Sequence, residues 1–179
     1  EIDVTEKITL GYKKGQDPVT LQVVSIYSGK EAVSFRDTIA EDGEDVLSDR
    51  YLNYYDDYYP GVERSADTRF VDNRFDNQFT VYENYRIDPV NLKDKFFEKI
   101  PVRGDSVRSK IVEVSVKGRR YPAFLRFPIW VKHTVEVHNM PYSIDPLDST
   151  WLIEPYLNFA STSFGGDSSH TFIWQLRTL

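Results

Sequence analysis

Histidine and serine are the residues of this chain that could take part in acid–base or nucleophilic chemistry. The chain has three histidines, His133, His138 and His170, and no cysteine. Without cysteine, a thiol nucleophile, a disulfide framework and a thiolate metal site are excluded from these 179 residues. Serine hydrolysis needs a serine, a histidine and an acid in one geometry, and no sequence motif here indicates such a set. We therefore expect no catalytic residue.

The three histidines are also poor candidates for metal ligands. His133 and His138 are five residues apart on one predicted strand, so they point to opposite faces and do not form a chelating pair. His133 has apolar neighbours and is expected to be a hydrogen-bonded core histidine. His170 lies beside a turn and has no identifiable base or nucleophile as a partner.

Two groups of oxygen-bearing side chains could in principle bind calcium. One contains Asp72, Asp76 and Asn77, and the other contains Asp145 and Asp148. A calcium site takes six to eight oxygen ligands, and neither group matches an EF-hand loop. Turn formation explains both groups, so we expect neither a metal nor a cofactor.

Aromatic side chains with neighbouring acids could instead bind a sugar or a peptide. Tyr59 is close in sequence to Asp56 and Asp57, and an exposed tyrosine ring can stack on a sugar whose hydroxyls donate to carboxylates. Trp130 falls on the polar face of its predicted strand together with Lys132, and is a second candidate for an exposed contact. The possible ligand contacts are therefore Tyr59, Trp130, Asp56 and Asp57.

The tyrosine-rich segment also has helical periodicity, which favours a structural role. We predict a helix near residues 44–59 that ends at Pro60-Gly61. Its apolar stripe consists of Leu47, Tyr51, Tyr54, Tyr55 and Tyr58. This spacing favours burial of the rings against a sheet, with the acidic residues of positions 42–49 on a solvated face.

A second helix is predicted immediately before it, near residues 29–40. Ser28 and Glu31 match a capping box, in which the serine hydroxyl and the glutamate carboxylate each accept a backbone N–H at the start of a helix. Ala32, Phe35 and Ile39 would form its buried stripe.

The remaining chain alternates between apolar and polar residues in a way that is typical of strands. We predict strands at 2–12, 19–27, 68–74, 78–87, 129–137, 151–153, 156–164 and 170–179, the second of them central because both its faces are apolar. Residues 89–122 are ambiguous, with a possible strand at 96–100, a short helix at 105–111 and another strand at 112–116. The fold class is therefore α+β: a mostly antiparallel, sandwich-like sheet with a two-helix insertion packed on it, in a single domain of residues 1–179.

Charge and hydropathy exclude some kinds of partner. The formal net charge is -6 and the lysines and arginines are scattered among the acids, whereas a nucleic-acid-binding surface needs a basic face. No run approaches the ~20 apolar residues of a membrane span. The alternating pattern begins with the first residues, so we expect a piece of a longer polypeptide whose export signal would lie outside it.

Several short motifs, taken in order, resemble a known family. They are Thr20-Leu21-Gln22-Val23, Tyr27-Ser28-Gly29-Lys30-Glu31-Ala32, Phe35-Arg36, Tyr51-Leu52-Asn53-Tyr54-Tyr55, Tyr59-Pro60 and Asn77-Gln78-Phe79-Thr80-Val81-Tyr82-Glu83-Asn84-Tyr85. The chain resembles the region that follows the transglutaminase-like domain in multidomain bacterial proteins that begin with a β-rich domain of unknown function. This resemblance implies a non-catalytic accessory domain of a periplasmic or extracellular protein. The family's Cys-His-Asp triad would lie in the adjacent domain, and none of its roles transfers to a residue here.

Two functional hypotheses follow, from different classes. The first is an accessory or structural domain that positions or completes the adjacent transglutaminase-like domain of the same polypeptide. The alternative is a free-standing β-sandwich module that binds a glycan or a peptide. An enzyme in its own right ranks third.

Overall fold

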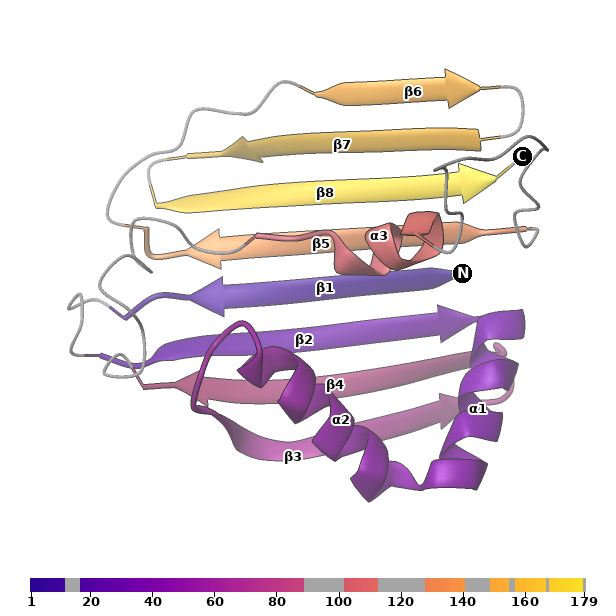
Figure 1. Cartoon of the computed structure of the whole chain (residues 1–179), viewed down its shortest axis with the longest axis horizontal. Helices are drawn as coiled ribbons and strands as arrows, with labels where there is room; N and C mark the ends of the chain where they lie inside the picture. Colours follow the sequence, from indigo (N-terminus) through magenta and orange to yellow (C-terminus); the bar gives the residue numbers. More distant parts are fainter. Residues whose placement is uncertain are drawn as a thin grey trace.

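Alternating apolar residues build the sheet on which this fold is based. The computed structural model describes residues 1–11, 17–88, 102–112, 128–140, 149–154, 157–166 and 168–178. Its elements are β1 (Ile2–Thr9), β2 (Val19–Ser28), α1 (Lys30–Asp42), α2 (Glu44–Asp56), β3 (Val62–Asn73), β4 (Gln78–Ile87), α3 (Asp105–Val112), β5 (Trp130–His138), β6 (Thr150–Glu154), β7 (Leu157–Gly165) and β8 (Ser169–Thr178). The strands of these described residues form one eight-stranded sheet in the order β3-β4-β2-β1-β5-β8-β7-β6 (Figure 1).

The sheet consists of two antiparallel parts, which meet at the parallel pair of β1 and β5. All other neighbouring strands are antiparallel, but β1 and β5 run parallel, with Val4 opposite His133 and Glu6 opposite Val135. On one side of this seam lie β3, β4, β2 and β1, which we call the N-terminal half-sheet. On the other side lie β5, β8, β7 and β6, the C-terminal half-sheet.

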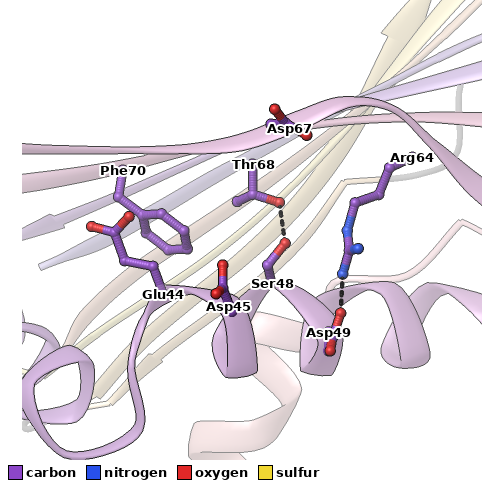
Figure 2. A pocket seen from close by; sticks show the side chains of 8 residues that line it. All are labelled: Glu44, Asp45, Ser48, Asp49, Arg64, Asp67, Thr68 and Phe70. Carbon is purple, nitrogen blue, oxygen red and sulfur yellow. Dashed lines mark hydrogen bonds and ion pairs between the residues drawn. The ribbon is translucent and has the colours of Figure 1, made fainter.

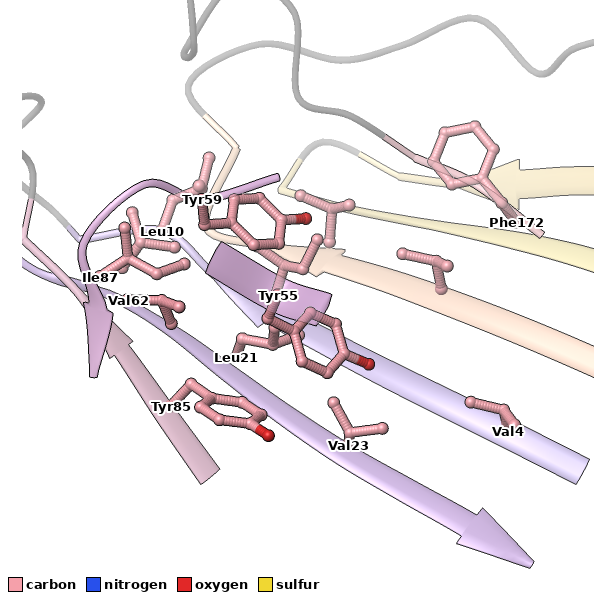
Figure 3. Close-up of a cluster of buried hydrophobic side chains, with 14 of the residues drawn as sticks. Val4, Leu10, Leu21, Val23, Tyr55, Tyr59, Val62, Tyr85, Ile87 and Phe172 are labelled. Carbon is pink, nitrogen blue, oxygen red and sulfur yellow. The ribbon is translucent and has the colours of Figure 1, made fainter. Parts of the chain in front are cut away.

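The three helices of the described residues lie on the same face of the sheet, which we call the helix face (Figure 1). Helices α1 and α2 cover the N-terminal half-sheet, and α3 lies over β5. The main core fills the space between α2 and the sheet, where Tyr55 and Tyr59 reach down to Leu21, Val23 and the neighbouring strands (Figure 3). A smaller cluster joins Val107 of α3 to Val131 and Leu176.

The predicted α+β class, with a mostly antiparallel sheet and two helices packed on it, is confirmed. The sandwich-like layout is corrected, because the described strands form a single sheet and helices provide the second layer. The main core lies on the helix face, between the sheet and the helices packed on it.

The start of α1 differs from the predicted capping box. Ser28 is the last residue of β2, and Gly29 occupies the N-cap with φ 63° and no side-chain hydrogen bond. The Ser28 N–H donates to the carbonyl of Glu1 at 2.9 Å, so this serine belongs to the sheet. The buried stripe is as predicted: Ala32 is fully buried, and Phe35 stacks on Tyr27 with ring centroids 4.4 Å apart.

The tyrosine-rich helix forms as predicted but ends earlier, at Asp56. Hydrogen bonding continues for a further turn, since Tyr59 N–H donates to the Tyr55 carbonyl at 2.8 Å, and Gly61 then reverses the chain with φ 75°. Leu47 and Tyr55 are buried, but Tyr54 is 37% exposed, so the stripe is narrower than expected.

The strands at 2–9, 19–28, 78–87 and 130–138, and the hairpin formed by β7 and β8, confirm the alternation patterns. The predicted helix at 105–111 is α3, which includes Val112, so that residue does not begin a strand. The predicted strand at 96–100, Tyr12, Asp145, Asp148 and the rest of 112–116 lie outside the described residues. Within the part of the chain that the structure describes, no helix is both long enough and apolar enough to cross a membrane.

Candidate functional site

The sheet register places two carboxylates in the core of the N-terminal half-sheet. Glu6 of β1 lies opposite Val23 of β2, and Val23 lies opposite Glu83 of β4. Their exposures are 8% for Glu6 and 2% for Glu83. A buried carboxyl group destabilises the fold unless it is hydrogen-bonded, so the partners of Glu6 and Glu83 determine whether these residues are structural or reactive.

Tyrosine hydroxyls supply those partners. The Tyr55 hydroxyl donates to Glu6 Oε1 at 3.0 Å, and the Tyr85 hydroxyl donates to Glu83 Oε2 at 2.5 Å. The two rings lie side by side, with centroids 5.0 Å apart (Figure 3). Helix α2 is thus fastened to β1 through a polar contact inside the core.

Burial controls the ionisation of this cluster. It raises the pKa of Glu83 to about 7; the Tyr85 hydrogen bond lowers that pKa, and the nearby Glu6 carboxylate raises it. The pKa of Tyr55 is raised well above its ordinary value, mainly by burial and then by the charge of Glu6. Tyr55 therefore remains a neutral hydrogen-bond donor.

Next to Glu6, the fold assembles a serine, a histidine and an acid. Ser106 Oγ lies 3.0 Å from His133 Nδ1, and His133 Nε2 lies 3.4 Å from Glu6 Oε1. His133 is 2% exposed, which confirms the predicted core histidine. Sequence reasoning missed this set, because its members are far apart in the chain and no local motif connects them.

The geometry around His133 is that of a helix cap. The Ser106 backbone N–H also donates to His133 Nδ1, at 3.3 Å, and Ser106 lies in the first turn of α3. A nitrogen that accepts an N–H carries no proton, so the ring proton lies on Nε2, facing Glu6. His133 thereby satisfies a free N–H at the start of α3, a group that otherwise has no intrahelical partner.

A small cavity beside this cluster has no room for a substrate. Glu6, four tyrosines, Arg103 and Asp105 line it, and its volume is about 10 Å³, which admits at most a single water. The Tyr54 hydroxyl donates to Asp105 Oδ2 at 2.8 Å, and the Arg103 guanidinium lies 4.7 Å from the centre of the Tyr58 ring. These contacts close the space between α2 and α3.

A larger groove of about 470 Å³ runs between α2 and β3 (Figure 2). Its lining is mostly polar and comprises Glu44, Asp45, Ser48, Asp49, Arg64, Asp67, Thr68 and Phe70. Contacts across it already pair Ser48 with Thr68 at 2.7 Å and Arg64 with Asp49 at 2.6 Å. No group of acids or histidines suited to a metal ion occurs among the described residues.

The predicted ligand-contact residues are not brought together. Tyr59 is 3% exposed and lies in the core (Figure 3), so its ring is not available to a ligand at the surface. Asp56 accepts the Gly61 N–H at 2.7 Å and Asp57 is exposed at the end of α2. Trp130 is 46% exposed, but it alternates with the buried Val131 and so lies on the opposite face of the sheet.

The turn residues that could have bound calcium have structural partners instead. Asp72 accepts from Arg36 at 2.9 Å and from Arg74 at 3.0 Å, and Asn77 accepts from Arg36 at 2.7 Å. Asp76 accepts from the Asn73 amide at 2.7 Å. These contacts fix the β3–β4 turn against α1.

The other two histidines stay apart from the cluster. His138 Nε2 lies 3.2 Å from Glu136 Oε2 near the end of β5. His170 is 1% exposed, and neither of its ring nitrogens has a hydrogen-bond partner within the described part of the chain.

No protein-family model, no curated protein and no solved structure matches this chain.

Proposed function

We propose that the chain is a non-catalytic accessory domain of a bacterial, exported transglutaminase-like protein, and that it positions or completes the adjacent catalytic domain. The proposal takes its context from the ordered motifs that resemble the region following such domains, from residue 20 to residue 85. The absence of cysteine fits a role in which the nucleophile belongs to the neighbouring domain.

The single observation that carries the non-catalytic part is the second hydrogen bond at His133 Nδ1, which comes from the Ser106 backbone N–H. That nitrogen receives both the hydroxyl and the backbone N–H of Ser106, at 3.0 and 3.3 Å. A serine hydroxyl on a histidine nitrogen is also the resting contact of a catalytic pair, but in such a pair the nitrogen's lone pair is free to take the serine proton. Here the Ser106 backbone N–H donates to the same lone pair. The cavity that Glu6 lines is too small for a substrate, and the groove of about 350 Å³ on the other side of Ser106, beside Val107 and Trp174, is not lined by Ser106, His133 or Glu6.

The test compares the adjacent transglutaminase-like domain with and without this chain attached. We expect the joined protein to have a higher melting temperature and a higher catalytic rate, because the accessory domain restricts the catalytic domain. The two parts melting independently, with unchanged activity, would contradict the proposal. Ser106→Ala in the joined protein is the control: retained activity supports a capping role, and its loss would point to catalysis by this chain.

A second candidate is a glycan- or peptide-binding module, and the opposite face of the sheet favours it. The register places Trp130, Arg177, Asn158 and Ile153 in one row across β5, β8, β7 and β6. Trp151 lies in the next row and is 66% exposed. Exposed indoles with polar groups between them suit stacking on sugar rings. Binding of an oligosaccharide that is lost in Trp130→Ala but retained in Phe75→Ala, at a fully exposed turn, would support this candidate.

A further inference from the structure

Strand β6 is apolar on both faces although it lies at the edge of the sheet. Trp151, Leu152 and Ile153 are 66%, 44% and 76% exposed, and within the described residues β6 pairs with β7 alone. Figure 1 shows it as the outermost strand of the C-terminal half-sheet. A strand with apolar side chains on both faces is typical of the interior of a sheet.

The opposite edge of the sheet shows how this fold protects a strand. The pairing of β3 with β4 has register shifts between Arg64 and Ala66 and between Ala66 and Arg69. Charged residues recur along β3, at Glu63, Arg64, Asp67, Arg69 and Asp72. Irregular pairing and charge both discourage the addition of another strand. Strand β6 pairs regularly with β7 and has no charged residue among its three central positions.

We propose that β6 is a self-association surface, and that it pairs antiparallel with β6 of a second copy around a two-fold axis at Leu152. An edge strand has backbone N–H and C=O groups directed outward, and a second strand would satisfy them. The two sheets would then continue into each other.

The sequence of β6 is self-complementary in this register. Trp151 of one copy lies opposite Ile153 of the other, and Leu152 lies opposite Leu152, so the apolar positions of both faces match. Thr150 lies opposite Glu154, which keeps the two glutamates at opposite ends of the paired strands. A two-fold interface needs this kind of match, because the same surface serves on both sides.

The interface is small. Three apolar side chains per copy bury less than the ~1,200 Å² of a standard stable interface. We therefore expect a reversible dimer with a dissociation constant on the order of 10 to 100 μM.

Sedimentation velocity over roughly 1 to 300 μM of the full chain tests the association, a range that brackets this constant. We expect concentration-dependent dimers, and a lysine in the edge, Ile153→Lys, to weaken them at least about tenfold. The matched control is Val71→Lys on the β3 edge, where Val71 is 38% exposed. A chain that remains monomeric throughout, or equal weakening by both variants, would overturn the proposal.

A cross-link tests the register independently of affinity. Because the chain has no cysteine, Leu152→Cys introduces a single thiol per copy. Directly opposed residues of antiparallel strands have Cα atoms about 4.5–5.5 Å apart, within reach of a disulfide. We expect mild oxidation to produce a covalent dimer of Leu152→Cys but not of Val71→Cys. Dimers in sedimentation without this disulfide would overturn pairing through β6.

Discussion

Glu6 and Glu83 occupy core positions that the alternation of their strands reserves for apolar side chains. Each carboxyl is satisfied by a tyrosine hydroxyl, from Tyr55 and Tyr85 respectively. Of the two, Glu83 has the clearer consequence for stability, because burial raises its pKa from 4.5 to about 7.

The raised pKa predicts that Glu83 makes folding pH-dependent. A carboxyl that binds its proton more tightly in the folded state stabilises the fold fully below its unfolded pKa, and this contribution is lost as the pH rises through about 7. Relative to Glu83→Gln, the native chain should lose about 3 kcal/mol of unfolding free energy between about pH 4.5 and 7. Urea unfolding of both proteins across this range measures the difference.

Glu63→Gln is the control for that measurement, since Glu63 is exposed on β3. Its difference from the native chain should stay constant over the same pH range. Parallel pH profiles for the native chain and Glu83→Gln would mean that Glu83 is ionised in the folded protein.

Two neighbouring tyrosines of α2 should differ in their contributions. Tyr55→Phe leaves the buried Glu6 without its hydroxyl donor, and we expect a loss of about 1–3 kcal/mol. Tyr54→Phe removes a hydrogen bond to Asp105 at an exposed position and should cost under about 1 kcal/mol. Denaturant midpoints compare them, and equal losses would contradict the burial difference.

At the scale of the element, the position of α3 depends on close contact between Gly104, which precedes the helix, and Trp174 of β8. A Cβ atom added to Gly104 would lie 2.6 Å from Trp174 Cδ2, so only glycine lets the start of the helix lie against the indole. We expect Gly104→Ala to cost about 1–3 kcal/mol through this overpacking. The melting temperature and the tryptophan fluorescence of the folded state measure the effect.

Gly166→Ala is the matched control, because nothing lies within 4 Å of its added Cβ. Its effect should stay within about 0.5 kcal/mol. Equal destabilisation by both variants would show that the contact between Gly104 and Trp174 does not hold α3 in place.

Local patterns predicted the elements better than they predicted the contacts between them. Alternating apolar residues identified β1, β2, β4 and β5, and apolar residues at helical spacing identified α2. The spacing of apolar residues along a short stretch of sequence is enough to show which face of a strand or helix is buried. The predicted capping box at Ser28 was wrong, because Ser28 is the last residue of β2 and Gly29 is the N-cap of α1. The cluster of Ser106, His133 and Glu6 has no local signal, because the parallel pairing of β1 with β5 and the packing of α3 on β5 bring these residues together.

At the scale of the whole molecule, the β1–β5 seam decides whether the two half-sheets unfold as one. The main core cluster spans it, from Leu21 and Tyr55 to Val135 and Phe172, and Lys132 lies 3.5 Å from Asp3 across the pairing. The three tryptophans, Trp130, Trp151 and Trp174, all belong to the C-terminal half-sheet. Tryptophan fluorescence therefore reports on the C-terminal half-sheet, where Trp174 packs against the main core cluster.

This placement predicts that a substitution in α2 shifts the tryptophan signal. Tyr55→Ala removes a buried ring from the N-terminal half and should cost about 3–5 kcal/mol. Through the seam, its fluorescence midpoint should fall together with the midpoint from far-ultraviolet circular dichroism. A fluorescence midpoint that stays at the native value would show that the half-sheets unfold separately.

The irregular β3 edge limits how far an assembly of this protein can extend. If two chains join through β6, each outer border of the combined sheet is a β3 strand with its bulges and charges. Neither border offers a regular template to a third chain. Growth therefore ends at the pair, and raising the protein concentration should yield no fibrils.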